Sequence, residues 1–218
     1  MRTITVKGMG TASVKPDLIV VTMRIQTIDK DYEKMMDDEV KKLDKLSKSL
    51  EKIGFEKDAI KTTSFDVRTK YESVRKENGS YKSVFIGYVC DHNLKIEFEM
   101  DMKKLAKVLS AIASCEAEPV FDVSFTVKDL AQINQELLKS ASKNALEKAE
   151  VLCSASNVKL GKLVSIDYNW GEINVYSHTQ YKMGRDCVGR AKECASNIDI
   201  TPDDIDLSDT ATFVWEIV

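Results

Sequence analysis

The apolar residues of this chain change their spacing several times, and the order of the changes excludes most fold classes. Apolar and polar residues alternate over residues 4–14 and 18–27, and then apolar residues recur every three or four positions over residues 31–53. Alternation is typical of a strand with one buried face, and the longer spacing is typical of an amphipathic helix. The complete order is β-β-α, then β-β-α-β, then α-β-β. Because strands and helices do not alternate strictly, this order favours an α+β fold of two-layer α/β sandwiches with mainly antiparallel sheets over a doubly wound parallel sheet.

The same order predicts two domains, one inserted into the other. The β-β-α-β block, residues 63–128, is predicted to form a smaller subdomain with its own sheet. Residues 1–62 and 129–218 are predicted to form an outer α/β sandwich domain built from both chain ends. Lys15, Pro16 and Asp17 form a turn sequence that predicts a hairpin between the first two strands. The alternating segment 210–218 is predicted to pair inside a sheet.

Two glycines near the start, Gly8 and Gly10, raise the question of a phosphate-binding loop. A dinucleotide loop needs a third glycine with a helix directly after it, and a Walker loop needs Gly-Lys-Ser/Thr. Here a strand resumes and the Pro16 turn follows. The two glycines are therefore predicted to permit a bulge or close packing within a strand.

A second long helix is predicted to lie very close to a sheet. Asp129 and Gln132 have the spacing of a capping box, in which the first side chain caps the helix and the second bonds back to the cap. Small side chains shorten the distance between a helix and a sheet. The predicted inner row of this helix holds three alanines, and its members are Ile133, Leu137, Ala141, Ala145, Ala149 and Leu152.

Several short motifs, in order along nearly the whole chain, resemble those of the SIMPL-domain family, which includes bacterial YggE-like proteins. The family pattern G-x-G-x-A/V-x-V-x-P-D is matched by residues 8–17, and later matches are residues 60–63, Tyr71 with Gly87 and Tyr88 across a hairpin, residues 160–161 and the closing strand. The resemblance implies two α/β sandwich subdomains, the inner one ferredoxin-like. It also implies ring-like or channel-like oligomers in some bacterial members and a link to oxidative-stress defence. It implies no established catalytic activity and supplies no catalytic residues.

The residues themselves predict no catalytic, cofactor-binding or metal site. The two histidines, His92 and His178, lie in different blocks without a nucleophile motif such as G-x-S-x-G. Each is therefore interpreted as a hydrogen-bonded or exposed histidine rather than a catalytic one. The acidic residues near the C-terminus lack the glycine and the final glutamate of a calcium loop. These residues are Asp203, Asp204, Asp206 and Asp209.

An aromatic hairpin is the best candidate for a contact surface. Tyr71, Tyr81, Phe85 and Tyr88 are interleaved with basic residues. The net charge of -3 argues against nucleic acid as the partner. The hairpin is therefore predicted to contact a second subunit or a protein partner. The leading hypothesis is a non-enzymatic protein that forms homo-oligomers or binds a protein partner, in the stress defence that the resemblance implies.

Five cysteines leave other hypotheses open. None forms a Cys-x-x-Cys motif or lies at ligand spacing from a histidine, which argues against a zinc site. Cys187 and Cys194 bracket a polar segment and are candidates for a redox pair. The alternatives to the leading hypothesis are thus a redox-responsive module that uses these two thiols and an uncatalogued enzyme.

The start of the chain predicts where the protein is located. Residues 1–14 lack the continuous apolar stretch of an export signal, and the longest apolar run, residues 18–21, is too short to span a membrane. These features predict a cytoplasmic protein without a membrane span. A mature chain that has lost its signal peptide would look the same, which keeps a periplasmic or exported location open.

Overall fold

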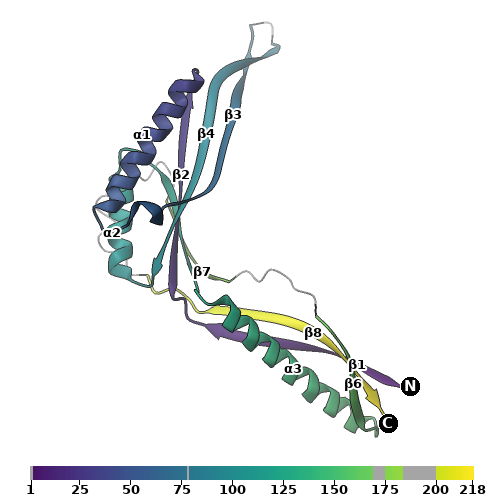
Figure 1. Ribbon diagram of the computed structural model, residues 1–218. Coiled ribbons are helices and arrows are strands. Elements are labelled where there is room, and N and C mark those ends of the chain that lie inside the picture. Colours follow the sequence, from purple (N-terminus) through teal and green to yellow (C-terminus); the bar gives the residue numbers. More distant parts are fainter. Residues whose placement is uncertain (1, 78, 169–174, 184–199) are drawn as a thin grey trace. The chain divides into compact units, whose positions relative to one another are not determined.

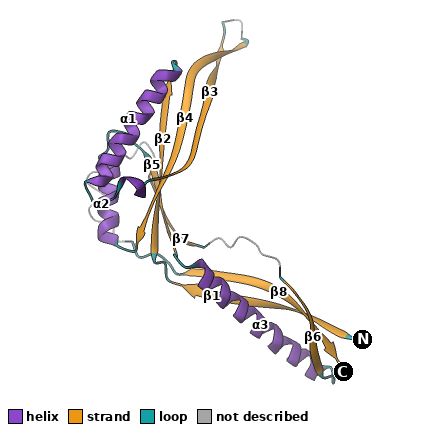
Figure 2. Ribbon diagram, viewed as in Figure 1, coloured by secondary structure: helices purple, strands orange, loops and turns teal. Residues whose placement is uncertain are grey.

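The computed structural model describes residues 2–77, 79–168, 175–183 and 200–218. Helices and strands follow one another in a mixed α+β order, so the predicted fold class is confirmed (Figures 1 and 2). The structure adds a strand at residues 176–183, which the order of elements predicted from the sequence does not contain. The elements are β1 (Thr3–Val14), β2 (Leu18–Asp29), α1 (Tyr32–Glu51), a 3₁₀ turn (Lys57–Ala59), β3 (Lys61–Arg75), β4 (Tyr81–Glu99), α2 (Met102–Ala113), β5 (Val120–Thr126), α3 (Leu130–Ala155), β6 (Leu160–Asp167), β7 (Tyr176–Met183) and β8 (Ile205–Ile217).

The chain divides into two compact units. The first comprises Met1–Asp17, Thr126–His178 and Pro202–Val218, and the second comprises Leu18–Phe125 and Thr179–Thr201. These bounds differ from the predicted boundary after residue 62, because residues 18–62 lie in the second unit. The physical reason is strand pairing: β2 pairs with β4 along its whole length, and α1 packs against β2 and β4.

The first unit is a three-stranded sheet with α3 against it. The strand order is β1-β8-β6, and both pairs are antiparallel. The predicted hairpin between β1 and β2 is wrong, because β1 pairs with β8 and β2 belongs to the other sheet. Asp17 holds the chain where it leaves β1: its N–H donates to Thr126 O at 3.0 Å and its Oδ1 accepts from Lys128 N at 2.8 Å. The predicted pairing of the last strand inside a sheet is confirmed, since β8 is the central strand.

Close packing between α3 and β1 explains the two glycines. A Cβ atom on Gly8 would lie 2.1 Å from Ala141 O, and one on Gly10 would lie 2.0 Å from Leu137 O. The β1–β8 register runs without a shift, so the glycines serve close packing and not a bulge. The alanine row predicted for α3 is buried as expected. The exception is Leu152, which is exposed, while Cys153 is buried in its place.

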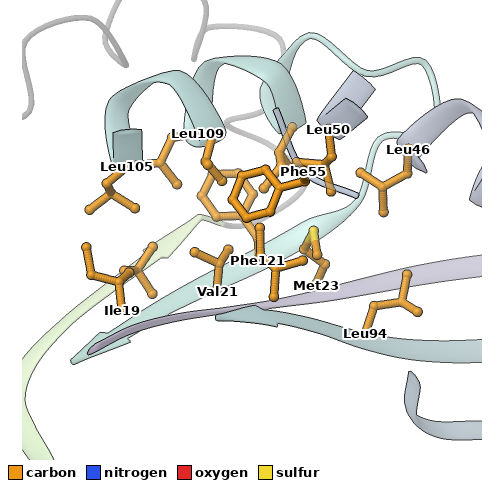
Figure 3. Packing of buried hydrophobic residues seen from close by; sticks show 14 of the residues in the cluster. Ile19, Val21, Met23, Leu46, Leu50, Phe55, Leu94, Leu105, Leu109 and Phe121 are labelled. Atoms are coloured by element: carbon orange, nitrogen blue, oxygen red, sulfur yellow. The ribbon is translucent and has the colours of Figure 1, made fainter. Parts of the chain in front are cut away.

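The second unit is ferredoxin-like. Its elements follow the order β2-α1-β3-β4-α2-β5, and the sheet has the strand order β3-β4-β2-β5-β7. The pairs β3–β4 and β2–β4 are antiparallel. Both helices lie on one face of this sheet (Figure 2). Figure 3 shows the resulting core, in which Ile19, Val21 and Met23 of β2 face Leu46 and Leu50 of α1 and Leu105 and Leu109 of α2.

Each helix of the second unit begins at an aspartate. Asp31 Oδ1 accepts from the N–H groups of Glu33 and Lys34. At the start of α2, Asp101 Oδ1 accepts from the N–H groups of Lys103 and Lys104. Such a cap satisfies backbone donors that have no partner inside the helix. Among the described residues, no helix combines the length and the apolar character needed to cross a membrane.

Candidate functional site

The β3–β4 hairpin contains a strand, β3, that is exposed along almost its whole length. β3 has 15 residues and forms an edge of its sheet, and every residue in it is exposed except the half-buried Val67. Figure 1 shows the hairpin extending past the end of α1, so its outer part has no helix over it. The outer side of an edge strand presents backbone donors and acceptors that can pair with another strand. Among the described strands, β3 therefore has a hydrogen-bonded neighbour on one side only.

A β-bulge arranges aromatic residues on the hairpin. Lys70 pairs with Gly87 but Tyr71 pairs with Phe85, so one residue of β4 is left over. In a regular strand, residues three apart point to opposite faces, and the extra residue brings Phe85 and Tyr88 to the same face. Gly87 is required there, because a Cβ atom would lie 2.5 Å from Asp29 O.

The aromatic rings meet edge to face. Ring centroids are 5.5 Å apart for Tyr71 and Phe85, 5.4 Å for Phe85 and Tyr88, and 5.5 Å for Tyr88 and Tyr32. Three of the four predicted contact residues thus lie together, and Tyr32 of α1 extends the row. Tyr81 is 70% exposed and lies nearer the tip, without a ring contact among the described residues. Tyr32 lies in the helix predicted over residues 31–53, and it is 48% exposed.

On the sheet face opposite the helices, an ion cluster holds β3, β4 and β2 together. Asp91 is buried, and its Oδ1 accepts from Arg24 Nε at 2.9 Å and from Gln26 Nε2 at 2.8 Å, while its Oδ2 lies 2.6 Å from Arg68 Nη1. Burial alone would raise the pKa of the Asp91 carboxyl. Hydrogen bonds from Arg24 and Gln26 and the charges of Arg24 and Arg68 outweigh burial and hold that pKa below its usual 3.8.

Under α1, a buried polar cluster joins four elements. His92 Nδ1 lies 2.9 Å from Glu39 Oε1, and His92 Nε2 lies 2.9 Å from Thr62 Oγ1. Thr27 Oγ1 donates to Glu39 Oε2 at 2.7 Å. His92 is thus buried and hydrogen-bonded at both ring nitrogens, which is one of the two states that the sequence indicated for it. The sequence did not indicate that Glu39 or Thr62 contacts His92, because Glu39, Thr62 and His92 lie far apart in the chain.

The other candidate residues that the structure describes do not come together in one place. Cys187 and Cys194 lie outside the described residues, and His178 is an exposed residue of β7. Asp206 and Asp209 lie in β8, where they accept hydrogen bonds from Ser13 Oγ and Tyr168 OH, both at 2.6 Å. Among the described residues, no three His, Cys, Asp or Glu side chains come close enough to hold a metal ion. The cysteines described as free and buried are Cys90, Cys115 and Cys153.

The two α/β units, one of them ferredoxin-like, define an α+β protein with an exposed strand hairpin. The chain belongs to the SIMPL family, whose model is described as "Protein of unknown function (DUF541)" and matches residues 4–215. The predicted family is confirmed. That description assigns no activity to the family, and thus none to this chain.

The chain is also similar to two curated proteins at low sequence identity. They are the 26 kDa periplasmic immunogenic proteins of Brucella abortus (strain S19) and Brucella melitensis biotype 1, each 22% identical to this chain over 163 residues. The match covers 75% of this chain and 65% of each relative, which is less than two thirds of their length.

Proposed function

We propose that this SIMPL-family chain is not an enzyme and acts by assembly, in which β3 of one copy pairs with β3 of a second copy. The observation that supports this proposal is the 15-residue edge strand, exposed on both faces and next to the row of aromatic rings. Edge strands of this length are usually covered, interrupted or charged, because they pair with other chains. Here the strand carries charges, and their order favours a particular pairing.

The charges of β3 are complementary to those of a second β3 in antiparallel orientation. A two-fold axis at Tyr71 places the two Tyr71 residues opposite each other and Lys70 of each copy opposite Glu72 of the other. Every such contact occurs twice in a two-fold interface. Opposite charges facing each other across two strands contribute about 0.2–1 kcal/mol per pair, and an aromatic pair adds a similar amount.

A charge exchange tests this pairing directly. We expect Glu72→Lys to place like charges opposite each other and to weaken self-association at least about tenfold, which corresponds to about 1.4 kcal/mol. Lys70→Glu should weaken it similarly, and the double variant should restore it because the opposite charges are back in place. Sedimentation equilibrium on the full chain measures each association constant. Val151→Lys, on the exposed side of α3, is the matched control and should change nothing.

Two results would contradict the proposal. One is a monomer at high micromolar concentration for the unchanged chain. The other is a double variant that stays as weak as the single variants, which would mean that Lys70 and Glu72 do not face each other in the assembly.

We also propose an exported location for this chain, which is the second location that the sequence left open. The support is the name of the two Brucella relatives, which are described as periplasmic. Cell fractionation of the natural host tests it, with the protein expressed from its full coding region. Recovery with cytoplasmic markers alone would exclude export.

A further inference from the structure

Glu39, His92 and Thr62 form a continuous hydrogen-bonded chain that ends at the hydroxyl of an exposed residue. A carboxylate, an imidazole and a hydroxyl in this order, each within hydrogen-bond distance of the next, are the arrangement that activates a hydroxyl nucleophile. We propose that Thr62 is a modification site, whose Oγ1 takes an acyl group from an activated acyl ester with His92 as the base. This inference does not rest on the proposed assembly.

Glu39 orients the imidazole. The Glu39 side chain is 3% exposed, and its two oxygen atoms contact the Thr27 hydroxyl and His92 Nδ1. A carboxylate only accepts hydrogen bonds, so the Nδ1 atom carries the hydrogen in this contact. When the imidazole is neutral, its lone pair is therefore on Nε2, 2.9 Å from Thr62 Oγ1. We assign this tautomer from the hydrogen bonds, and it is the one that a base for Thr62 requires.

In such a site the base and the carboxylate are buried and the residue that reacts is exposed, and the three residues here have this pattern. His92 and Glu39 are buried, and the Phe65 ring packs edge to face against the His92 ring with centroids 5.0 Å apart. Thr62 is exposed at the start of the edge strand β3. The base is therefore shielded from water, while the hydroxyl belongs to an exposed residue and makes a part-buried contact with the base.

A second β-bulge places Thr62 on the face of His92. Thr62 pairs with Leu94 but Ser64 pairs with Asn93, so Thr63 is an extra residue. Thr62 and Phe65 consequently share one face of β3, although they are three residues apart. Bulges are common beside functional sites, where they redirect a side chain. The bulge also supplies a natural comparison, because Thr63 Oγ1 donates to Asn93 O at 3.2 Å and has no histidine partner.

A cysteine beside this cluster, Cys90, has an unreactive thiol. Cys90 lies on β4 opposite Thr27, and burial together with the nearby charges of Glu39 and Asp91 raises the pKa of its thiol to about 11. A thiol reacts as the thiolate. Cys90 therefore stays protonated at neutral pH and does not compete with Thr62. The other hydroxyl of the cluster, on Thr27, is buried and bonded to Glu39 rather than to His92.

The chemical step uses only the acyl ester and the chain. Thr62 Oγ1 forms a bond to the acyl carbon, and His92 Nε2 takes the hydroxyl proton. The bond between that carbon and the ester oxygen breaks, and the alcohol part leaves with the electron pair, as phenolate when the donor is a phenyl ester. The product is one acyl group in ester linkage on Thr62, so the reaction is stoichiometric and needs no turnover.

Acetylation with p-nitrophenyl acetate tests the proposal on the full chain. We expect mass spectrometry of proteolytic peptides to show Thr62 acetylated at least about 100-fold faster than Thr63, the gain typical of a positioned general base. His92→Gln should lower the Thr62 rate by a similar factor, and Glu39→Gln should lower it as well. Thr62→Ser should keep the reaction, because the hydroxyl remains. Thr63→Ala is the matched control and should leave the Thr62 rate unchanged.

The comparison of two hydroxyls within the unchanged chain decides the outcome even if a variant fails to fold. Equal acetylation of Thr62 and Thr63 would overturn the proposal, and so would a folded His92→Gln variant that reacts at the original rate. The oligomeric state, measured separately, reports only on the assembly proposed above. In the pairing centred on Tyr71, residue 62 would face residue 80, beyond the end of β3, so the hydroxyl stays accessible in that assembly.

Discussion

At the scale of single residues, missing side chains are as informative as present ones. Gly8 and Gly10 lie under α3 where a Cβ atom would overlap the backbone oxygen atoms of the helix. A backbone oxygen cannot move aside as a flexible side-chain end can, because the whole turn of the helix would have to shift. The small residues of α3 and the two glycines of β1 thus bring helix and sheet into contact from both sides.

Gly8→Ala should destabilise the protein by about 1–3 kcal/mol, because overpacking forces the helix away from the sheet. Urea unfolding followed by circular dichroism measures the change. Met9→Ala is the control, since Met9 is next in the strand but 51% exposed, and its change should stay within about 0.5 kcal/mol. Equal effects of the two substitutions would mean that α3 does not limit the space at Gly8.

Asp91 predicts a pH dependence of stability. Its folded pKa lies below the usual 3.8, so its contribution is present above about that pH and is lost as pH falls through the folded pKa. Asp91→Asn should therefore lower the unfolding free energy by about 1–3 kcal/mol at pH 7, and the difference from the unchanged chain should shrink below pH ~3.8. Urea unfolding between pH 2 and ~7 measures it. Asp66→Asn, at the exposed carboxylate beside Arg68, should show little change at any pH.

At the scale of elements, the start of α3 confirms one half of the predicted capping box and not the other. Asp129 Oδ1 accepts from Gln132 N at 3.0 Å, which confirms the N-cap. The side chain of Gln132 instead donates to Glu136 Oε1 at 3.4 Å, along the helix rather than back to the cap. The reciprocal half of the capping box is therefore replaced by a contact within α3.

Asp129→Ala should lower the unfolding free energy by about 0.5–2 kcal/mol, the typical cost of an N-cap that accepts from the backbone. Gln132→Ala should cost only a few tenths, because its side-chain contact is long and exposed. Thermal unfolding of both variants gives the comparison. A larger loss for Gln132→Ala would show that its side chain does cap the helix in solution.

At the scale of the whole molecule, each unit has its own buried cluster. Phe213 and Trp215 are packed with the α3 alanines in the first unit, while Leu50 and its neighbours form the core of the second. The chain passes between the units after residues 17, 125, 178 and 201. A core of its own is what a unit needs in order to open and close separately.

Leu50→Ala should therefore destabilise the second unit by about 2–5 kcal/mol, the cost of a cavity in a core. In native-state hydrogen exchange, the amides of β2 and β4 should lose protection, and those of β1 and β8 should keep it. Phe213→Ala is the reciprocal variant and should have the opposite pattern. Uniform loss of protection in either variant would show that the two cores open as one.

Most helices and strands could be predicted from the sequence, but their partners could not. The helix expected over residues 31–53 is α1. The hairpin expected from its aromatic residues is β3 with β4, in which Tyr71 pairs with Phe85. Periodicity reports which face of an element is apolar, and it holds no information on which distant segment covers that face. The predicted hairpin of β1 and β2 failed for this reason, since adjacency in the chain was the only guide to pairing.

The candidate sites divide in the same way. Tyr71, Phe85 and Tyr88 could be chosen because aromatic residues are enriched in protein interfaces. The contact between Glu39 and His92 could not, because 53 positions separate the two residues and each has an ordinary place in its own element. Only the packing of α1 on the sheet removes both side chains from water and makes each the partner of the other.

The sequence by itself determined the family, the α+β class and the local order of helices and strands, because these depend on spacing within short segments. The tertiary structure decided which strands share a sheet, why Gly8 and Gly10 must lack side chains, and which polar groups meet under α1. Those features depend on contacts between segments as far apart as β1 and β8, whose pairing joins the two ends of the chain. Such contacts form only when the fold brings the segments together.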